Sequence, residues 1–340
     1  MSAGINISLP RRGRGRLSGA AQGEYDERLQ EFCGAILQIQ STLDFKVSSR
    51  GWCYILEEYG LLKGDFDKAQ GLLVECRKKG YLPLDIVIED GARSFENLED
   101  IDDTTPEEEA ADIIDGLQWR HLQYTPTSFW DDQKYYIEML VEKVDLKSLF
   151  SKICAEFHIP IANARGWSDL NSRAAMMRRF VEHEDAGREC VLLYCGDHDP
   201  GGLAISDFLQ SNLEELEPAV GWDPGLLIID RFGLNHDFIQ KHNLTWINNL
   251  ETGSKKRLDD PRHPDHHKPY VQDYLRQYGA RKVEANALVV RVEAGRQLCR
   301  DAINKYVDPT SVDQHRNHLA TEREKVRTEV ARLLEDGAAL

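Results

Sequence analysis

Apolar positions recur with a helical period in the first part of the chain. Spacings of three and four residues predict helices over 25–43, 49–60 and 67–79. The segment 81–91 then predicts a short extended hairpin or wing. Three short helices followed by an extended element are the pattern of a winged-helix, helix-turn-helix domain. We therefore expect such a domain over residues 23–95.

After Trp130 the pattern changes to short apolar runs that alternate with amphipathic segments. Short links between alternating strands and helices favour a largely parallel sheet with right-handed crossovers. We expect an α/β domain over 131–310, with a mainly parallel sheet flanked by helices and a C-terminal extension. Its predicted strands are 135–141, 159–164, 190–195 and 226–231, and its predicted helices are 145–157, a segment with Leu170, Ala174, Met177 and Phe180 on one face, and 202–216.

Charged segments lie before, between and after these two domains. Residues 1–22 are rich in glycine and arginine and lack a hydrophobic period, so we expect a disordered basic arm. Residues 96–130 predict an acidic linker that contains a helix over 107–118. Residues 311–340 predict a charged C-terminal helix.

The net charge of −16 at pH 7 is unevenly distributed. The segment 96–115 contains ten acidic residues and no basic one, so the rest of the chain is far less acidic. This distribution leaves nucleic acid binding open despite the total charge. A solubilising terminus is the more common role of such a basic arm, and contact with phosphates is the alternative; its arginines are Arg11, Arg12, Arg14 and Arg16.

The seven cysteines are scattered, odd in number and form no Cys-x-x-Cys. This pattern argues against a disulfide framework and a zinc site and favours a reducing compartment. No apolar run approaches the roughly 20 residues of a membrane span, and the basic N-terminus lacks the apolar core of a signal peptide. We expect a cytoplasmic protein without a membrane segment.

The first candidate chemistry lies where the strand at 190–195 ends. Gly196 follows the strand, Asp197 and Asp199 come next, and a Pro-Gly-Gly turn opens a helical pattern. Ligands and metals collect at the carboxyl ends of strands in open α/β sheets. Two close carboxylates need a proton, a hydrogen-bond network or a cation, and hard oxygen ligands suit Mg²⁺. A solvated loop with an aspartate helix cap is the alternative.

Glu142 adds a third carboxylate at the same predicted edge, because it ends the strand at 135–141. Glu142, Asp197 and Asp199 therefore form a candidate Mg²⁺ site for phosphodiester chemistry. Taken alone, Glu142 also fits a surface acid paired with Lys143 or Lys147.

Three sequence blocks carry a family resemblance. They are Val141-Glu142-Lys143, then Gly166-x-x-Asp169-Leu170-Asn171-Ser172-Arg173, and Gly196-Asp197-x-Asp199-Pro200-x-Gly202. In this order and spacing they resemble a Toprim domain, more narrowly that of the topoisomerase VI A subunit and its meiotic double-strand-break relatives. The resemblance covers roughly residues 25–305, and 283–288 fits its later part less specifically.

In that family a winged-helix domain precedes the Toprim domain and bears a catalytic tyrosine, in a motif of Arg, two variable residues and two tyrosines. Here Arg50 and Tyr54 align with the motif, while Cys53 stands for the first tyrosine and Gly51 stands where an acid is usual. The pattern between Arg77 and Arg93 also resembles the family's. The alternative for Tyr54 is a core aromatic on a helix face, beside Trp52 and Ile55.

The resemblance implies cleavage of double-stranded DNA by transesterification. Tyr54 would become linked to the 5′ end, Arg50 would contact the phosphate, and Mg²⁺ on the three carboxylates would hold the scissile group. It further implies a homodimer in which each tyrosine meets the other subunit's metal site, and a separate ATPase subunit for strand passage. The candidate DNA-binding residues are Arg11, Arg12, Arg14, Arg16, Arg77, Arg93 and Arg173.

Two other functions stay open. The same carboxylates would serve a hydrolytic Toprim nuclease with water as the nucleophile, or the chain is a DNA-binding or regulatory subunit that acts only with a partner. Two weaker candidates have structural interpretations. His263, His266 and His267 resemble metal ligands but fit a polar turn, and Tyr59 precedes Gly60 where a helix ends and fits a packing role.

Overall fold

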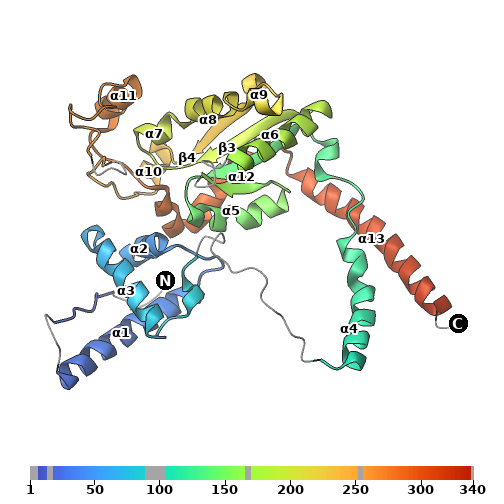
Figure 1. Cartoon of the computed structure of the whole chain (residues 1–340), viewed down its shortest axis with the longest axis horizontal. Helices are drawn as coiled ribbons and strands as arrows, with labels where there is room; N and C mark the ends of the chain where they lie inside the picture. Colours follow the sequence, from blue (N-terminus) through green and yellow to red (C-terminus); the bar gives the residue numbers. More distant parts are fainter. Residues whose placement is uncertain (1–6, 14–17, 89–103, 165–169, 252–255, 338–340) are drawn as a thin grey trace.

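The computed structural model describes residues 7–13, 18–88, 104–164, 170–251 and 256–337 (Figure 1). Its N-terminal part is helical, with α1 (Gly19–Gln40), α2 (Ser49–Glu57) and α3 (Phe66–Lys78). The three predicted helices are therefore confirmed. The Ser48 hydroxyl caps α2 by accepting a hydrogen bond from the Gly51 amide at 3.1 Å, which explains why this helix begins where it does.

Two expectations for this region need correction. The Ile7 amide donates to the Tyr59 carbonyl at 2.8 Å, and the Ile7 and Pro10 side chains are buried, so residues 7–10 pack on the helices. Residues 19–22, expected in the arm, begin α1. Over 81–88 the expected hairpin is replaced by the 3₁₀ helix η2 (Leu84–Ile86) and one parallel bridge from Val87 to Val47. Residues 89–91 lie outside the described residues.

The second part contains a four-stranded, all-parallel sheet in the order β2-β1-β3-β4. The predicted strands are confirmed, with shifted ends for the second and fourth; the observed bounds are β1 (Tyr135–Val141), β2 (Ile161–Asn163), β3 (Glu189–Cys195) and β4 (Ile228–Gly233). The central strands β1 and β3 are buried almost along their whole length, as continuous apolar runs in parallel sheets are.

Helices cover both faces of this sheet (Figure 1). One face carries α6 (Leu170–Asp185) and α8 (Ile205–Glu214), and the other carries α5 (Val144–Glu156) and α12 (Val292–Ile303). The predicted helix over 202–216 is divided, because the short α7 (Pro200–Leu203) precedes α8. The mixed α/β architecture with a parallel, helix-flanked sheet is therefore confirmed.

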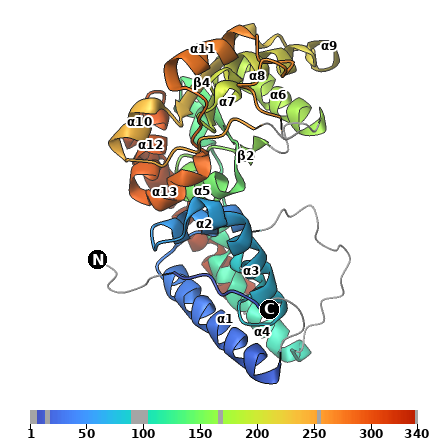
Figure 2. The same ribbon diagram turned by 90° about the vertical axis from the view of Figure 1, so that its left-hand side faces the viewer.

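The remaining helices follow or leave this core. They are α9 (Glu217–Val220), α10 (His236–Lys241), α11 (Pro269–Tyr278), the 3₁₀ helix η8 (Ala285–Val290), α4 (Pro106–Trp119) and α13 (Thr310–Gly337). The helices α4 and α13 confirm the predicted helices in the acidic linker and at the C-terminal end, and both extend away from the sheet (Figures 1 and 2). Residues 96–103 of the linker lie outside the described residues.

The N-terminal helices contact the sheet part through α2, which packs on η8. Figure 2 shows α1, α2 and α3 below the sheet, with α2 nearest to it. All seven cysteines are buried free thiols. No helix in the described part of the chain has both the length and the apolar composition of a membrane span.

Candidate functional site

The ends of β1 and β3 bring two predicted carboxylates together. Val141 and Cys195 are paired neighbours in the sheet, and the Glu142 amide extends the pairing by donating to the Cys195 carbonyl at 2.9 Å. In return, the Asp197 amide donates to Glu142 Oε2 at 2.7 Å. We call Glu142, Asp197 and Asp199 the carboxylate edge.

Two glycines allow this close approach. A Cβ atom on Gly196 would lie 2.7 Å from Glu142 Oε2 and 2.5 Å from the Tyr194 hydroxyl. A Cβ atom on Gly202 would lie 2.1 Å from the Asp197 carbonyl oxygen. Since real side chains do not tolerate such distances, both motif glycines are required by the packing around the carboxylates.

Lys143 bridges the first two carboxylates. Its Nζ donates to Glu142 Oε1 at 2.6 Å and to Asp197 Oδ2 at 2.9 Å. The other Asp197 oxygen accepts a hydrogen bond from the Ala285 amide at 2.8 Å. The two carboxylates thus direct one oxygen each at a single positive charge.

These contacts leave the edge short of positive charge. Burial raises the pKa of Asp197 to about 7; Lys143 opposes this change, while Glu142 and Asp199 add to it. Burial also acts on Glu142, but Lys143 and the Asp197 amide outweigh it and lower the pKa of Glu142. Within this edge Asp197 is therefore the carboxylate whose ionised form most needs a further cation.

Asp199 plays the capping role that the sequence left open. Its Oδ1 accepts a hydrogen bond from the Gly202 amide at 2.6 Å and begins α7. Within the residues that the structure describes, no group of three or more His, Cys, Asp or Glu side chains is arranged to hold a metal ion. The predicted three-carboxylate arrangement is thus incomplete, while the convergence of two hard oxygen donors on one cation matches the donor chemistry of Mg²⁺.

Tyr54 lies in a second cluster, on α2. Its hydroxyl donates to Glu284 Oε2 at 2.7 Å, and Arg50 Nε donates to the same oxygen at 3.1 Å. Lys282 Nζ lies 3.7 Å from Glu284 Oε1. We call Tyr54, Arg50 and Glu284 the Tyr54 cluster.

Tyr54 is only 1% exposed and packs edge-on against Phe66. Burial, followed by the Glu284 carboxylate, raises the pKa of Tyr54 well above its ordinary value. Burial would raise the pKa of Glu284 as well, but Arg50, the Tyr54 hydroxyl and Lys282 lower it. The cluster therefore holds a neutral phenol against an ionised carboxylate, an arrangement that suits a core aromatic as well as a nucleophile paired with a proton acceptor.

The two clusters share one short segment. Glu284 accepts a hydrogen bond from the Tyr54 hydroxyl. The amide of the next residue, Ala285, donates a hydrogen bond to Asp197. Tyr54 therefore lies beside the carboxylate edge of its own chain. The block 283–288 does not by itself indicate a role for Glu284, because a single glutamate far from both motifs carries no signal of its tertiary partners.

Asp145 fixes α2 in this position. Both its oxygens are engaged, by the Ser48 amide, by the Ser48 hydroxyl at 2.6 Å and by the Asn286 side-chain amide. A Cβ atom on Gly51 would lie 2.8 Å from Asp145 Oδ1. This contact leaves no room for a side chain at position 51.

A cleft of about 950 Å³ opens beside both clusters and is shared by the N-terminal helices and the sheet part. Lys143 and Arg50 line it, together with Glu284 and Asp145. Its basic lining residues are Lys46, Arg50, Arg77, Lys143, Lys147 and Lys152, against the acidic Asp44, Asp145 and Glu284. We call this the basic cleft; its excess of cations suits a phosphate backbone.

The predicted DNA-binding arginines are dispersed. Arg77 lines the basic cleft. Arg173 is buried and donates to the Asn212 carbonyl at 3.0 Å, so it joins α6 to α8. Arg11 and Arg12 are exposed. Arg14, Arg16 and Arg93 lie outside the described residues, as do Gly166 and Asp169 of the second motif block.

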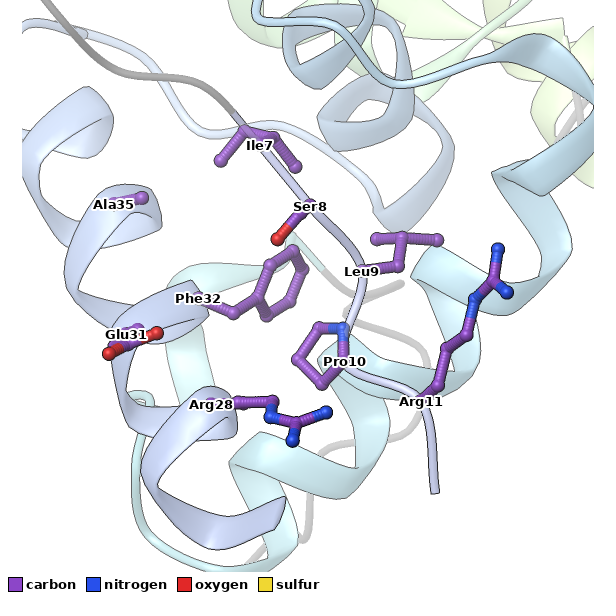
Figure 3. A pocket seen from close by; sticks show the side chains of 9 residues that line it. All are labelled: Ile7, Ser8, Leu9, Pro10, Arg11, Arg28, Glu31, Phe32 and Ala35. Atoms are coloured by element: carbon purple, nitrogen blue, oxygen red, sulfur yellow. The ribbon is translucent and has the colours of Figure 1, made fainter. Parts of the chain in front are cut away.

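A second hollow, of about 410 Å³, lies between the N-terminal segment and α1 (Figure 3). Ile7, Leu9, Pro10 and Arg11 line it from the N-terminal segment, and Arg28, Glu31, Phe32 and Ala35 line it from α1. It belongs to the packing of the N-terminal segment and contains none of the carboxylate edge.

The weaker candidates have structural roles. His263 Nδ1 accepts the Asp265 amide at 3.1 Å, and His266 Nδ1 lies 2.8 Å from the Leu258 carbonyl. These are the contacts of a polar turn. Tyr59 is partly buried and its carbonyl accepts the Ile7 amide.

Comparison of the chain with protein-family models, with curated proteins and with solved structures found no match.

Proposed function

We propose that this protein cleaves double-stranded DNA by Mg²⁺-dependent tyrosyl transesterification, as the motif resemblance implies. The observation that carries the proposal is the hydrogen bond of 2.7 Å from the Tyr54 hydroxyl to Glu284, one residue before the amide that holds Asp197. A nucleophile, a proton acceptor and the carboxylate edge are thereby gathered in one chain.

In the proposed step the Tyr54 oxygen attacks the phosphorus of a DNA phosphodiester. A bond between the tyrosine oxygen and phosphorus forms, the bond from phosphorus to the 3′ oxygen breaks, and a 5′-phosphotyrosyl end and a 3′ hydroxyl result. Glu284 accepts the phenolic proton, and the leaving 3′ oxygen takes up one proton from solvent. No oxidant or reductant is needed.

The chain's other residues have distinct parts in this proposal. Arg50 lies against Glu284 and lines the basic cleft, where its guanidinium can bind two phosphate oxygens. Glu142 and Asp197, with Asp199 beside them, are the residues that would hold Mg²⁺. When bound, Mg²⁺ supplies charge stabilisation to phosphate and leaving oxygens. Lys143, which lines the basic cleft, would be available to contact a phosphate once a cation takes its place at the carboxylates.

Hydrolytic cleavage is the second candidate, and the burial of Tyr54 favours it. A phenol that is 1% exposed and hydrogen-bonded to a carboxylate does not meet a phosphate without movement of α2. The same carboxylate edge with water as nucleophile would leave free 5′ phosphates. Tyr54 would then be a core residue.

The chemistry of the DNA ends distinguishes transesterification from hydrolysis. Supercoiled plasmid is incubated with the protein and Mg²⁺, digested with protease, and its ends are labelled. We expect protease-dependent, blocked 5′ ends that disappear in Tyr54→Phe and persist in the matched control Tyr59→Phe. Free 5′ phosphates with Tyr54→Phe still active would establish hydrolysis in place of transesterification. Absence of cleavage with any divalent metal would instead favour the regulatory-subunit alternative.

A further inference from the structure

The Lys143 ammonium lies at the point on which the carboxylate edge converges. Its Nζ donates to Glu142 Oε1 at 2.6 Å and to Asp197 Oδ2 at 2.9 Å. The second oxygen of each carboxylate is held by the backbone: Glu142 Oε2 accepts from the Asp197 amide at 2.7 Å, and Asp197 Oδ1 accepts from the Ala285 amide at 2.8 Å. Backbone contacts thus fix both carboxylates, and their remaining oxygens point at one cation.

A divalent cation and the Lys143 ammonium need the same two oxygens. Carboxylate oxygens bind Mg²⁺ at about 2.0–2.1 Å, so a metal ion between Glu142 Oε1 and Asp197 Oδ2 takes the place of Nζ. Two cations at so short a separation also repel each other. Binding of Mg²⁺ at this edge and the present position of Lys143 therefore exclude each other.

The Lys143 side chain is attached in a way that permits it to move. The residue is the N-cap of α5, in extended backbone, and its side chain makes no capping hydrogen bond. This side chain is 27% exposed, so its flexible four-carbon stem is not enclosed by the core. Arg231 differs, because it donates to the backbone carbonyls of Gly202 and Asp197. A metal ion at the carboxylates would leave those contacts in place.

The basic cleft offers Lys143 a second partner. Lys143 lines this cleft together with Arg50 and Lys147. An ammonium that leaves the carboxylates therefore remains in a space whose excess of cations suits phosphate oxygens. Since Mg²⁺ and a phosphate both favour the displaced lysine, each should strengthen the binding of the other.

We propose that Lys143 is an internal counterion with two alternative partners: the carboxylate edge in the metal-free chain, and a phosphate of bound DNA when Mg²⁺ is at the edge. The exchange couples Mg²⁺ binding to phosphate binding, so the metal is held most tightly when DNA lies in the cleft. The proposal rests on the Mg²⁺ site of the proposed function. It gives Lys143 a regulatory part that the transesterification step itself does not require.

Titration calorimetry with Mg²⁺ alone tests the competition. Lys143→Met keeps an unbranched side chain but removes the competing charge, so it should bind Mg²⁺ at least about tenfold more tightly than the wild type. Lys143→Arg, which restores the charge, should bind as weakly as the wild type. Lys134→Met is the matched control, because Lys134 pairs with Glu189 at 3.0 Å at the opposite ends of the same two strands. Unchanged or weaker binding in Lys143→Met overturns the proposal.

Acetylation of the wild-type chain gives a second readout that needs no substitution. A short pulse of an amine-acetylating reagent, followed by mass spectrometry of peptides, measures the reactivity of each lysine. Mg²⁺ should raise the acetylation rate of Lys143 and leave that of Lys134 unchanged. Duplex DNA added together with Mg²⁺ should lower the Lys143 rate again, because a phosphate then covers the ammonium. A Lys143 rate that ignores Mg²⁺, or that duplex DNA does not lower, overturns the exchange.

The outcomes distinguish this proposal from the proposed function. If the wild type binds Mg²⁺ and cleaves DNA but Lys143→Met binds the metal no more tightly, the counterion role fails and the cleavage mechanism stands. If Lys143→Met binds Mg²⁺ more tightly but protease-dependent DNA ends never form, transesterification fails and the counterion role stands. If neither chain binds Mg²⁺, both fail.

Discussion

The carboxylate edge and the Tyr54 cluster adjoin each other, yet their buried acids are in opposite electrostatic states. Arg50, Tyr54 and Lys282 surround the Glu284 carboxylate and lower its pKa. Burial raises the pKa of Asp197 to about 7; Lys143 opposes this change, and the neighbouring carboxylates Glu142 and Asp199 add to it. The first cluster is neutralised by the chain itself. In the second, Lys143 does not restore the ordinary pKa of Asp197, which is why we propose Mg²⁺ there.

The largest expected effect comes from removing the charge of Asp197. If the carboxylate edge holds the catalytic cation, Asp197→Asn should reduce Mg²⁺-dependent cleavage about 10²-fold or more, since a bound metal supplies several kcal/mol of charge stabilisation. Asp207→Asn, at an exposed aspartate on α8, is the matched control and should keep its rate. The initial rate of plasmid cleavage measures both.

A large effect on stability is expected at the contact that joins the two regions. Asp145→Ala leaves the donors of Ser48 and Asn286 buried without an acceptor, which should lower the free energy of unfolding by about 3 kcal/mol or more. Asp85→Ala, which removes an exposed partner of Lys46, should leave it nearly unchanged. Urea titration followed by circular dichroism compares them, and equal loss in the two variants would refute a fixing role for Asp145.

Two glycine substitutions sharpen the contrast between this contact and an open helix surface. Gly51→Ala places a methyl group 2.8 Å from Asp145 Oδ1 and should lower the free energy of unfolding by about 1–3 kcal/mol. Gly34→Ala on α1 meets nothing within 4 Å and should raise it by about 0.5–1 kcal/mol. The two changes should thus have opposite signs in the same urea titration.

The raised pKa of Asp197 predicts a pH dependence of the metal-free protein. An acid whose pKa is near 7 in the folded chain and about 3.9 in the unfolded chain binds more protons when folded. Stability is therefore lost as pH rises from about 4 to about 7. With EDTA present, Asp197→Asn should flatten this decline. An identical pH profile in the variant would show that Asp197 is ionised without a further cation.

The smallest effect is expected from a single lysine of the basic cleft. If Lys147 contacts a phosphate, Lys147→Ala should reduce the slope of log affinity against log salt concentration by about 1. Lys134→Ala, outside the cleft at the start of β1, should leave the slope unchanged. Fluorescence anisotropy with labelled duplex DNA at several salt concentrations provides the measurement.

Much of the fold could be predicted from sequence because its signals are local. The run at 135–141 and the run before Gly196 are continuous apolar segments of strand length, and both are central strands. The register that joins Glu142 to Asp197 follows from the end of each run. The prediction of an extended hairpin or wing over 81–91 is wrong over 81–88, because the pattern around Pro83 and Asp85 also suits a 3₁₀ turn.

The site was predictable only in part. Glu142 and Asp197 meet as expected, whereas the helix-capping role of Asp199 and the contact of Glu142 with Lys143 were open alternatives that the structure shows. Glu284 and Asp145 were missed. Each acts on partners far along the chain, such as Tyr54 and Ser48, and a lone acid in sequence does not indicate which tertiary contacts it makes.

Titration calorimetry with Mg²⁺ tests the central comparison most directly. The wild-type chain should bind Mg²⁺ at the carboxylate edge, Asp197→Asn should weaken binding at least about tenfold, and Glu284→Gln should bind as the wild type does. Binding that survives in Asp197→Asn, or that is lost in Glu284→Gln instead, would contradict the assignment of the cation to the carboxylate edge.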